Sequence, residues 1–383
     1  MRVLMVHNAY QQRGGEDSVV EAEATLLREQ GHEVVLHLRH NDDVNGMGRL
    51  AVAAQTLWSD RTVRDVKTLV GEFRPDVVHV HNTLPLVSPS VFWAARAAGV
   101  PVVQTLHNFR LMCPQATFLR DGRVCEDCLG KVPWRAVQHR CYRQSAVQSG
   151  AVAVMLSTHR ALGTFQNKVS RYIALNEFCK AKFVAGGLPA DRISVKPNFV
   201  PSPGQPQWAS RAGGLYVGRL SEEKGIQVLL GAMRLEPDLG VQIIGGGPFE
   251  DEVRGVAGEA YLGFRPLPDI MARMAHAAFL VLPSVCYEGF PRTLVEAFAS
   301  GMPVIASRLG SMAELVSDGR TGLLFEPGSA EDLAAKIRWA QAHPAEMLQM
   351  GQAARLEYEA RYTPERNCAE LIAIYRSAMA ESG

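Results

Sequence analysis

Two acidic residues eight positions apart are the most informative feature of this chain. Glu288 and Glu296 lie in the segment YEGFPRTLVEAFASG. The apolar run before them, residues 277–284, predicts a buried strand, and Pro291 fits the first turn of a helix that Gly301 can end. Backbone N–H groups at that helix start would face an anion such as a diphosphate, and the carboxylates could accept hydrogen bonds from sugar hydroxyls. The ordinary alternative is one loop glutamate and one solvated helix glutamate.

A basic pair ends the first strand predicted in the second half of the chain, in the segment GRLSEEKG (218–225). Arg219 can place two donors on phosphate oxygens, and Lys224 adds a compact positive charge near a helix start. Parallel α/β sheets bind ligands at the carboxyl ends of their strands. We therefore expect both residues to bind phosphate, the alternative being plain surface charges.

Glycine-containing turns follow other predicted strands. Gly14 and Gly15 precede a helix, where their backbone amides could approach a phosphate, although the spacing is not the G-x-G-x-x-G dinucleotide fingerprint. Gly246, in a GGGP turn, and Phe264, at the end of the next predicted strand, are expected to line a nucleoside pocket. Simple turn chemistry is the alternative for these glycines.

Three histidines lie at the ends of two predicted strands of the first half. His107 ends residues 101–107, and His79 and His81 end the strand before it. His107 is expected to point into a cleft as a candidate catalytic residue, with a structural role as the alternative. A metal site built from the three histidines is not predicted, because no carboxylate pattern lies near them in the sequence.

Four cysteines form a separate group with the spacing C-x11-C-x2-C-x12-C: Cys113, Cys125, Cys128 and Cys141. One close pair with two distant partners can hold zinc tetrahedrally. A structural zinc would explain how the irregular loop 109–143 is held in place. Reduced cysteines packed in the interior are an equal alternative, and redox chemistry is a third.

Short apolar runs that alternate with amphipathic stretches must position these residues. Continuous Val, Ile and Leu runs are typical of parallel strands covered by helices on both faces. The predicted strands are residues 2–8, 33–39, 76–82, 101–107, 172–176, 193–198, 214–220, 241–247, 260–264, 277–284, 303–308 and 322–327. Residues 15–31 and 88–99 have helical spacing with glycine stops. The pattern predicts an α/β protein of two Rossmann-like, doubly wound domains that face a cleft.

The domain boundary is expected near residue 200. The stretch VPSPGQPQWASRAGG (200–214) is rich in Pro, Gly and Ser and has little periodicity, so it predicts a linker and a candidate hinge. We expect an N-terminal domain over 1–199 and a C-terminal domain over 200–363. A last helix, 364–380, follows a break at Tyr-Thr-Pro and could pack on either domain.

Composition excludes several classes of function. The 383 residues carry a net charge of +1, with 47% hydrophobic and 21% charged residues, as in an ordinary globular protein that does not bind nucleic acid. No apolar run is long enough for a membrane span and no signal-peptide pattern is present, so a cytoplasmic location is expected. Residues 104–171 hold ten Lys or Arg against three acids, which favours an anionic acceptor or a peripheral position on the inner face of a membrane.

With these motifs the chain closely resembles the retaining glycosyltransferases of the two-Rossmann-domain (GT-B) architecture, family 4, also called glycosyl transferases group 1. The resemblance covers nearly the whole chain. It rests on the E-x7-E motif, the Arg219 and Lys224 pair, Asn198 near the crossover and the DVVHVHN strand.

The resemblance implies a role for each matching residue. Glu288 would contact hydroxyls of the transferred sugar, His107 would face the reacting sugar, and Arg219 with Lys224 would bind the diphosphate. Glu296 would contact the ribose, and the last helix would cross back to the first domain. The remaining substrate-binding positions belong to the same loop and helix: Gly289, Phe290, Pro291 and Leu294.

The expected reaction is transfer of a hexose from a GDP- or UDP-sugar to a glycan or lipid-linked acceptor of the cell surface, with retention and without a metal cofactor. The cations and the helix start would stabilise the leaving diphosphate. The chain has no Asp-x-Asp after a strand, the usual metal-dependent solution. Two rivals remain: a sugar-nucleotide epimerase of the same architecture, which needs no acceptor, and a nucleotide-sugar-binding protein without turnover.

Overall fold

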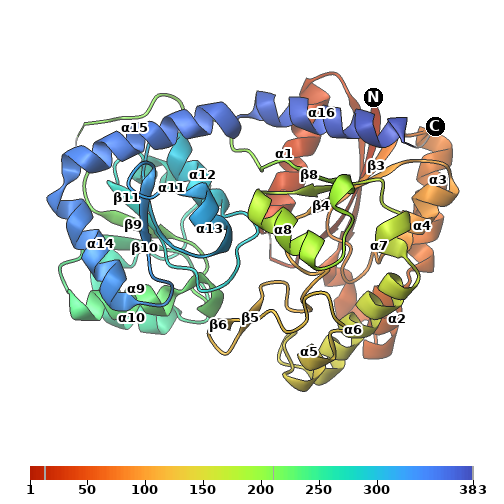
Figure 1. Ribbon diagram of the computed structural model, residues 1–383, viewed down its shortest axis with the longest axis horizontal. Helices are drawn as coiled ribbons and strands as arrows, with labels where there is room; N and C mark the ends of the chain where they lie inside the picture. The colour runs from red at the N-terminus through yellow and green to blue at the C-terminus, as the bar shows by residue number, and fades with distance from the viewer. Residues whose placement is uncertain (13, 210, 382–383) are drawn as a thin grey trace. The chain divides into compact units, whose positions relative to one another are not determined.

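The computed structural model describes residues 1–12, 14–209 and 211–381 and divides the chain into two compact units. Unit 1 comprises Met1–Phe118, Glu126–Pro197 and the chain from Glu365 on. Unit 2 comprises Leu119–Cys125 and Asn198–Pro364. Both are α/β structures built on a parallel sheet, as the alternating pattern predicts (Figure 1).

Unit 1 contains a six-stranded parallel sheet in the order β2-β1-β3-β4-β7-β8. Its strands are β1 (Arg2–Ala9), β2 (Glu33–His40), β3 (Val77–Val80), β4 (Val102–Leu106), β7 (Arg171–Ala174) and β8 (Ile193–Val195). Its helices are α1 (Gly15–Glu29), η1 (Asn41–Gly46), α2 (Arg49–Leu57), α3 (Asp60–Phe73), α4 (Ser90–Ala97), α5 (Trp134–Gln138), α6 (Ala146–Ala161), α7 (Thr164–Asn167), α8 (Glu177–Ala185), η2 (Ala190–Arg192) and α16 (Pro364–Ala380). The strand order changes direction beside β1, so the carboxyl ends of β1 and β3 lie where such sheets bind ligands.

Unit 2 contains a five-stranded parallel sheet in the order β10-β9-β11-β12-β13. Its strands are β9 (Gly214–Val217), β10 (Val241–Ile244), β11 (Phe279–Leu282), β12 (Val304–Ser307) and β13 (Gly322–Phe325). Its helices are η3 (Glu222–Lys224), α9 (Ile226–Leu235), α10 (Glu250–Ala257), η4 (Gly258–Ala260), α11 (Leu267–Met274), α12 (Arg292–Ala299), α13 (Gly310–Leu315), α14 (Ala330–Ala342) and α15 (Pro344–Arg361). The short antiparallel hairpin β5 (Leu119–Arg120) and β6 (Arg123–Val124) also groups with this unit.

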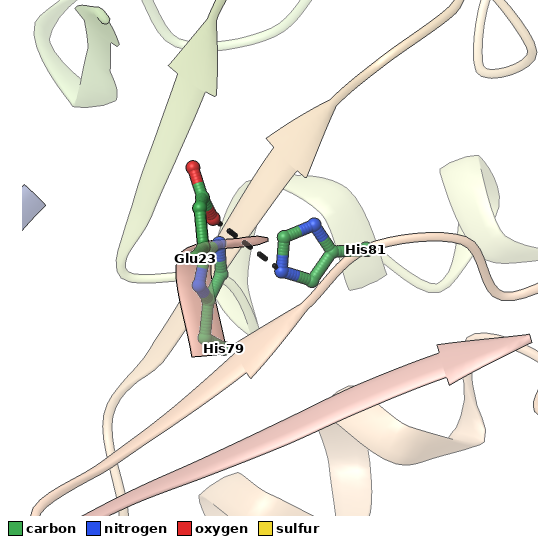
Figure 2. A group of neighbouring side chains, drawn as sticks. All are labelled: Glu23, His79 and His81. Atoms are coloured by element: carbon green, nitrogen blue, oxygen red, sulfur yellow. Dashed lines mark ion pairs between the residues drawn. The ribbon is translucent and has the colours of Figure 1, made fainter. Parts of the chain in front are cut away.

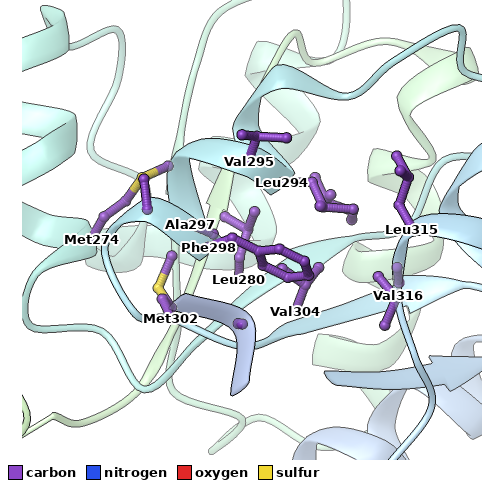
Figure 3. Close-up of a cluster of buried hydrophobic side chains, with 14 of the residues drawn as sticks. Met274, Leu280, Leu294, Val295, Ala297, Phe298, Met302, Val304, Leu315 and Val316 are labelled. Carbon is purple, nitrogen blue, oxygen red and sulfur yellow. The ribbon is translucent and has the colours of Figure 1, made fainter. Parts of the chain in front are cut away.

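The core of unit 2 has two layers, one on each face of its sheet. In β11, Leu280 and Leu282 pack against α12 and α15, while Phe279 and Val281 pack against α9 and α14. The alternation follows from the two-residue period of a strand. Figure 3 shows the first layer, in which Leu294 and Phe298 of α12 meet the sheet.

The sequence prediction was wrong at one strand and incomplete at one loop. Residues 260–264 do not form a strand, because only one bridge joins Tyr261 to Ile243. The loop 109–143, predicted to be irregular, contains the β5–β6 hairpin and the short helix α5. Its turns use left-handed backbone at several non-glycine residues, including Arg140 and Arg143.

The segment predicted as a linker is held against unit 2 along its described residues. The Tyr358 hydroxyl donates to the Val200 carbonyl at 3.0 Å, and the Arg355 guanidinium donates to the Gly204 carbonyl at 3.1 Å. Helix α16 instead bonds to the first sheet, where the Arg171 Nε donates to the Ser377 hydroxyl at 3.1 Å. None of the described helices is both long and apolar enough to cross a bilayer.

Candidate active site

Two residues that the sequence assigned to different parts of the substrate form an ion pair in unit 2. The Lys224 ammonium lies 2.7 and 2.9 Å from the two carboxylate oxygens of Glu288. The Ser284 hydroxyl, in the loop after β11, donates to Glu288 Oε1 at 2.7 Å. The Glu288 side chain is only 13% exposed and that of Lys224 is 35% exposed. The pair thus lies at the carboxyl ends of β9 and β11, where the sequence placed both residues.

A glycine lets the loop after β9 approach the loop after β11 closely enough for this pair to form. Gly225 has φ +65°, and a Cβ at this position would lie 1.8 Å from the Pro283 carbonyl oxygen. Beside it, the Val285 N–H donates to the Glu223 carbonyl at 3.1 Å. Only glycine fits both the backbone conformation and the space. The contact fixes the position of Lys224 relative to β11.

The electrostatic environment keeps Lys224 charged. Burial disfavours the charged form of Lys224, but the Glu288 carboxylate and its hydrogen bonds outweigh this effect and raise the lysine pKa. The buried Cys286 thiol lies in the same loop, and burial together with the Glu288 charge raises its pKa well above the usual value. Cys286 is therefore a protonated thiol rather than a nucleophile.

The helix that follows Glu288 begins one residue later than predicted. Pro291 is the N-cap of α12, and the helix runs from Arg292 to Ala299. The loop before it is fixed by the Ser311 hydroxyl, which donates to the Glu288 backbone carbonyl at 2.7 Å. Gly289 and Phe290 lie in this loop, directly before the first turn of α12, whose N–H groups could bind an anion.

Two predicted binding residues of α12 have different environments. Glu296 lies inside the helix as expected, and burial raises its pKa although Arg292, 3.6 Å away, acts in the opposite direction. Leu294 is 0% exposed and its side chain packs in the core, so a substrate contact of this residue would have to come from its backbone (Figure 3). The Leu294 side chain lies on the face of α12 that packs against the sheet.

The glycine turn after β10 packs directly against the loop that carries Arg219. The Leu220 N–H donates to the Gly246 carbonyl at 3.0 Å, and a Cβ on Gly245 would lie 1.9 Å from the Gly218 carbonyl oxygen. The structure thus brings Gly246 next to the basic segment. Arg219 is exposed, and no contact of its guanidinium with another described residue is seen.

Phe264, predicted to line a nucleoside pocket, is 80% exposed. Its neighbour Gly263 accepts a hydrogen bond from the Gly245 N–H at 3.1 Å, so the turn itself lies beside the glycine loop. The backbone of this segment has the predicted location, but the phenyl ring does not pack against it.

A cavity of about 850 Å³ in unit 2 lies away from these residues. It is lined by Gly214, Gln242 and Arg273, at the amino ends of β9 and β10. Ligands of parallel α/β sheets bind at the opposite, carboxyl edge. We therefore place the site at the Lys224 and Glu288 pair despite the size of this cavity.

In unit 1, the start of α1 is occupied by its own acidic residues. The Gly14 N–H donates to Asp17 Oδ2 at 2.7 Å, and Glu16 accepts from Asn108 Nδ2 at 2.6 Å. The two carboxylates in the first turn of α1 would repel an anion at this end of the helix. This arrangement does not favour the phosphate contact predicted for Gly14 and Gly15.

The three histidines lie side by side at the carboxyl ends of β3 and β4. The rings of His79 and His81 are 4.1 Å apart, and those of His81 and His107 are stacked at 5.1 Å. His81 Nδ1 and His107 Nε2 are 2.8 Å apart and share a hydrogen bond. His79 is bonded through both nitrogens, to Thr105 and to Tyr375 of α16.

Burial keeps all three imidazoles neutral at physiological pH. Desolvation lowers the pKa values of His79 and His81 well below 6.5, and it lowers that of His107 to about 3. A neutral imidazole has one donor and one acceptor nitrogen. His107 therefore cannot supply a proton as an imidazolium, but it can accept or donate one hydrogen bond.

A carboxylate that the sequence analysis did not anticipate lies beside these histidines. Glu23, from α1, has a ligand atom within 4.8 Å of those of His79 and His81. Figure 2 shows the three side chains together. The argument that no carboxylate is near was therefore wrong. The Lys196 ammonium nevertheless donates to Glu23 Oε1 at 2.7 Å, and both side chains are 0% exposed. A fixed positive charge here and the two hydrogen bonds of His79 do not fit a divalent metal site.

The four cysteines of the predicted zinc site contain no disulfide. Cys113 and Cys128 are buried, whereas Cys125 and Cys141 are partly exposed. Cys125 groups with unit 2 and the other three with unit 1. The zinc site therefore stays a prediction, and elemental analysis of the purified protein would decide it.

Comparison with known proteins agrees with this fold. Two Rossmann-like units, each built on a parallel sheet, are the GT-B architecture. Residues 14–198 match the family model for the glycosyl transferase 4-like domain, and residues 213–357 match that for glycosyl transferases group 1. The chain belongs to the group 1, or family 4, glycosyltransferases and is a transferase enzyme.

Individual relatives are distant. The sulfoquinovosyl transferase SQD2 of Arabidopsis thaliana is 26% identical over 76% of the chain, which spans only 54% of that protein's length. A phosphatidyl-myo-inositol mannosyltransferase of Mycolicibacterium smegmatis is 27% identical, with 85% of this chain and 80% of that protein covered. Among solved structures, sucrose-phosphate synthase from Thermosynechococcus elongatus superposes with a TM-score of 0.75 at 20% identity, covering 99% of each chain. Anabaena Alr3699/HepE in complex with UDP gives 0.66 at 18% identity, covering 98% and 100%.

Proposed function

We propose that the protein transfers a hexose from a nucleoside-diphosphate sugar to a glycan or lipid-linked acceptor, with retention of anomeric configuration and without a metal cofactor. The contact that carries this proposal is the Lys224 and Glu288 pair. It places a charged donor and a carboxylate acceptor together at the start of α12. A diphosphate would bind to the charged donor, and sugar hydroxyls would donate hydrogen bonds to the carboxylate.

The reaction follows from these charges. The bond from the anomeric carbon to the phosphate oxygen breaks, a bond to the acceptor oxygen forms, and the acceptor's hydroxyl proton passes to the departing diphosphate. Negative charge grows on the diphosphate as it leaves. Lys224, the exposed Arg219 and the N–H groups of α12 would stabilise that charge. Attack from the face that the diphosphate leaves retains the configuration.

A nucleotide-sugar donor is also supported by a structural neighbour. Anabaena Alr3699/HepE has been crystallised with UDP and with UDP-glucose. Its 18% identity supports a common fold, so the base and sugar used by this protein need a direct measurement.

A cavity in unit 1 suits an acceptor that has both an anionic and an apolar part. The cavity is about 520 Å³ and lies between α2 and α6. Arg49 and Arg143 line it together with apolar residues such as Met47 and Val52, and none of its described lining residues is acidic. Arg143 has φ +51°, a strained conformation of the kind found at binding sites. A sugar carried on a lipid phosphate combines these two properties.

The test is a donor screen that follows nucleoside diphosphate release, with and without acceptor and with and without chelator. Acceptor-dependent release that survives chelator supports the proposal. Conversion of the donor without acceptor indicates the epimerase, and binding without turnover indicates an accessory protein.

A separate variant tests whether the unit 1 cavity binds the acceptor. Arg143→Gln is expected to raise the KM for a lipid phosphate-linked acceptor about tenfold, because a charge-assisted hydrogen bond is lost. Arg64→Gln, an exposed arginine on α3, is the matched control. Equal KM values for the two variants would reject the cavity as the acceptor site.

A further inference from the structure

A continuous chain of buried polar contacts leads from an ion pair in unit 1 to His107. The Lys196 ammonium donates to Glu23 Oε1 at 2.7 Å and to the Asn367 side-chain oxygen at 3.1 Å. Glu23 Oε2 lies 3.9 Å from His81 Nε2. His81 Nδ1 in turn lies 2.8 Å from His107 Nε2. Figure 2 shows Glu23 and His81 facing each other across the dashed line.

The two atoms in the middle of this chain determine where the protons lie. Glu23 Oε2 and His81 Nε2 are buried, and neither has a hydrogen-bond partner in the part of the chain that the structure describes. If His81 Nε2 carried no proton, a lone pair would face a carboxylate oxygen in the interior. That arrangement is unfavourable, whereas an N–H directed at the carboxylate is attractive. The Nε2–H tautomer of His81 is therefore selected.

The tautomer of His81 dictates that of His107. A neutral His81 with a proton on Nε2 has a bare Nδ1, which can only accept. The proton in the 2.8 Å contact must then belong to His107 Nε2. His107 Nδ1 is left as an acceptor, and it contacts no other described residue. The His107 ring lines a cavity of about 30 Å³ together with Glu16 and Asn108.

We propose that Glu23 and Lys196 are positioning residues that hold His107 as its Nε2–H tautomer, so that Nδ1 accepts a hydrogen bond from a substrate hydroxyl. An imidazole fixed in this way selects a hydroxyl donor such as a sugar and disfavours a phosphate oxygen, which is itself an acceptor. The identity of that hydroxyl as part of the donor sugar rests on the proposed function. The proton arrangement itself does not.

Proton positions can be measured directly on the full-length protein. In a sample labelled with 15N-histidine, two-bond 15N–1H correlation spectra distinguish the protonated nitrogen of each neutral ring. At pH 7.5 we expect His107 to be in the Nε2–H form by at least about tenfold, the ratio that one hydrogen bond to a charged group supplies. His107→Gln assigns the signals. A wild-type His107 that is protonated on Nδ1 would overturn the proposal without any need for a further variant.

The variant Glu23→Gln provides a second test, because it should reverse the donor and acceptor roles in the hydrogen bonds that lead to His107. With its oxygen kept on Lys196, the Gln amide would donate to His81 Nε2, and His81 Nδ1–H would donate to His107 Nε2. His107 should then switch to the Nδ1–H form. His159 is an internal control, since its Nε2 contacts the Leu57 carbonyl at 2.8 Å and must stay protonated. An unchanged His107 tautomer in a folded Glu23→Gln variant would also reject the proposal.

Activity separates a positioning role from a purely structural one. Glu23→Gln is expected to lower kcat/KM for the sugar nucleotide about tenfold while the affinity for the free nucleoside diphosphate is unchanged, because only the hydroxyl contact is lost. An equal loss of affinity for the free nucleotide would contradict this role. If the wild-type protein transfers no sugar, the proposed function fails, and the tautomer spectra still decide the proposal.

Discussion

At Glu288 a single carboxylate accepts hydrogen bonds from Lys224 through both oxygens and from Ser284 through one of them. An ionised carboxylate offers about four acceptor positions. Three are therefore occupied by the protein, and one direction is left for a sugar hydroxyl. The protein contacts fix the orientation of the carboxylate before any substrate arrives, which reduces the entropy lost on binding.

Glu288→Gln should lower the turnover for sugar transfer by about 100-fold, a typical loss when one oriented group at a reacting centre is removed. The amide would place an N–H₂ group toward the Lys224 ammonium and lose the negative charge. Affinity for the nucleoside diphosphate, measured by calorimetry, should change little.

Glu252→Gln is the control for this variant, because Glu252 is a partly exposed carboxylate of the same unit that is paired with Arg234. A Glu288→Gln enzyme as active as this control would remove Glu288 from the mechanism.

The sequence could place single residues but not their partners. Glu288 and Glu296 have the expected locations, because an apolar strand and a proline-started helix are local signals. The Lys224 partner of Glu288 is 64 positions away, and Lys196 is 173 positions from Glu23. Such pairs depend on how loops approach each other in space, which no spacing along the chain reveals. A buried Glu23 in an otherwise regular helix gave no signal of its own.

Among the elements, the loop between β9 and α9 depends on one glycine. Gly225→Ala should destabilise unit 2 by at least about 2 kcal/mol, because alanine is strained at φ +65° and its Cβ would overlap the Pro283 carbonyl. Displacement of the loop should also move Lys224 away from the position in which it would bind the diphosphate, so nucleoside diphosphate affinity should fall. Urea unfolding and calorimetry measure the two effects.

Gly255→Ala is the matched control. Gly255 lies in α10, and a Cβ there would have no atom within 4 Å. Alanine should raise the free energy of unfolding by about 0.5–1 kcal/mol at such a helical position. Loss of stability in this variant, or none in Gly225→Ala, would contradict the steric argument.

Helix α12 joins the core to the candidate site, because Leu294 lies in the core while the Glu296 side chain is 13% exposed. Leu294→Ala should lower the free energy of unfolding by about 2–5 kcal/mol, the range for a fully buried leucine. Leu356→Ala on α15, where the leucine is 66% exposed, should cost under about 0.5 kcal/mol. A similar small cost in both variants would restore Leu294 as a candidate substrate contact.

The amphipathic pattern also explains which elements could be predicted. The strands of both sheets and helix α16 match their predicted positions closely, because their apolar periods are regular. Residues 260–264 have a strand-like composition, but Gly263 at φ +71° ends the pairing after Tyr261. The hairpin in the loop 109–143 has strands of only two residues, which is too short for any periodicity to be detected.

For the molecule as a whole, the buried histidines make stability depend on pH. Their folded pKa values lie below the ordinary 6.5, so the unfolded chain binds more protons as pH falls below 6.5, and stability is lost in that window. Between pH 7.5 and 5.5 the three histidines should lower the free energy of unfolding by about 4 kcal/mol, which is about 1.4 kcal/mol for each group. Most of this loss falls in the pH unit below 6.5. Glu16 and Glu296, whose pKa values burial raises, act in the opposite direction at lower pH.

Hydrogen exchange at the two pH values, corrected for intrinsic rates, would measure this effect by segment. Protection of β3 and β4, which carry the histidines, should fall between pH 7.5 and 5.5, whereas that of β11 and β12 should change much less. Equal changes in all four strands would show that the histidines do not dominate the pH dependence.

The chain crosses four times between its two units, and the crossings at Pro197–Asn198 and at Pro364–Glu365 are hydrogen-bonded to each other on both sides. In unit 1, the Asn367 amide donates to the Pro197 carbonyl at 2.7 Å, and in unit 2 the Val200 N–H donates to the Tyr362 carbonyl at 3.4 Å. These two hydrogen bonds leave only a few residues of each crossing segment between one unit and the other. A protease cut in one of these two segments should therefore leave the two units joined through the other.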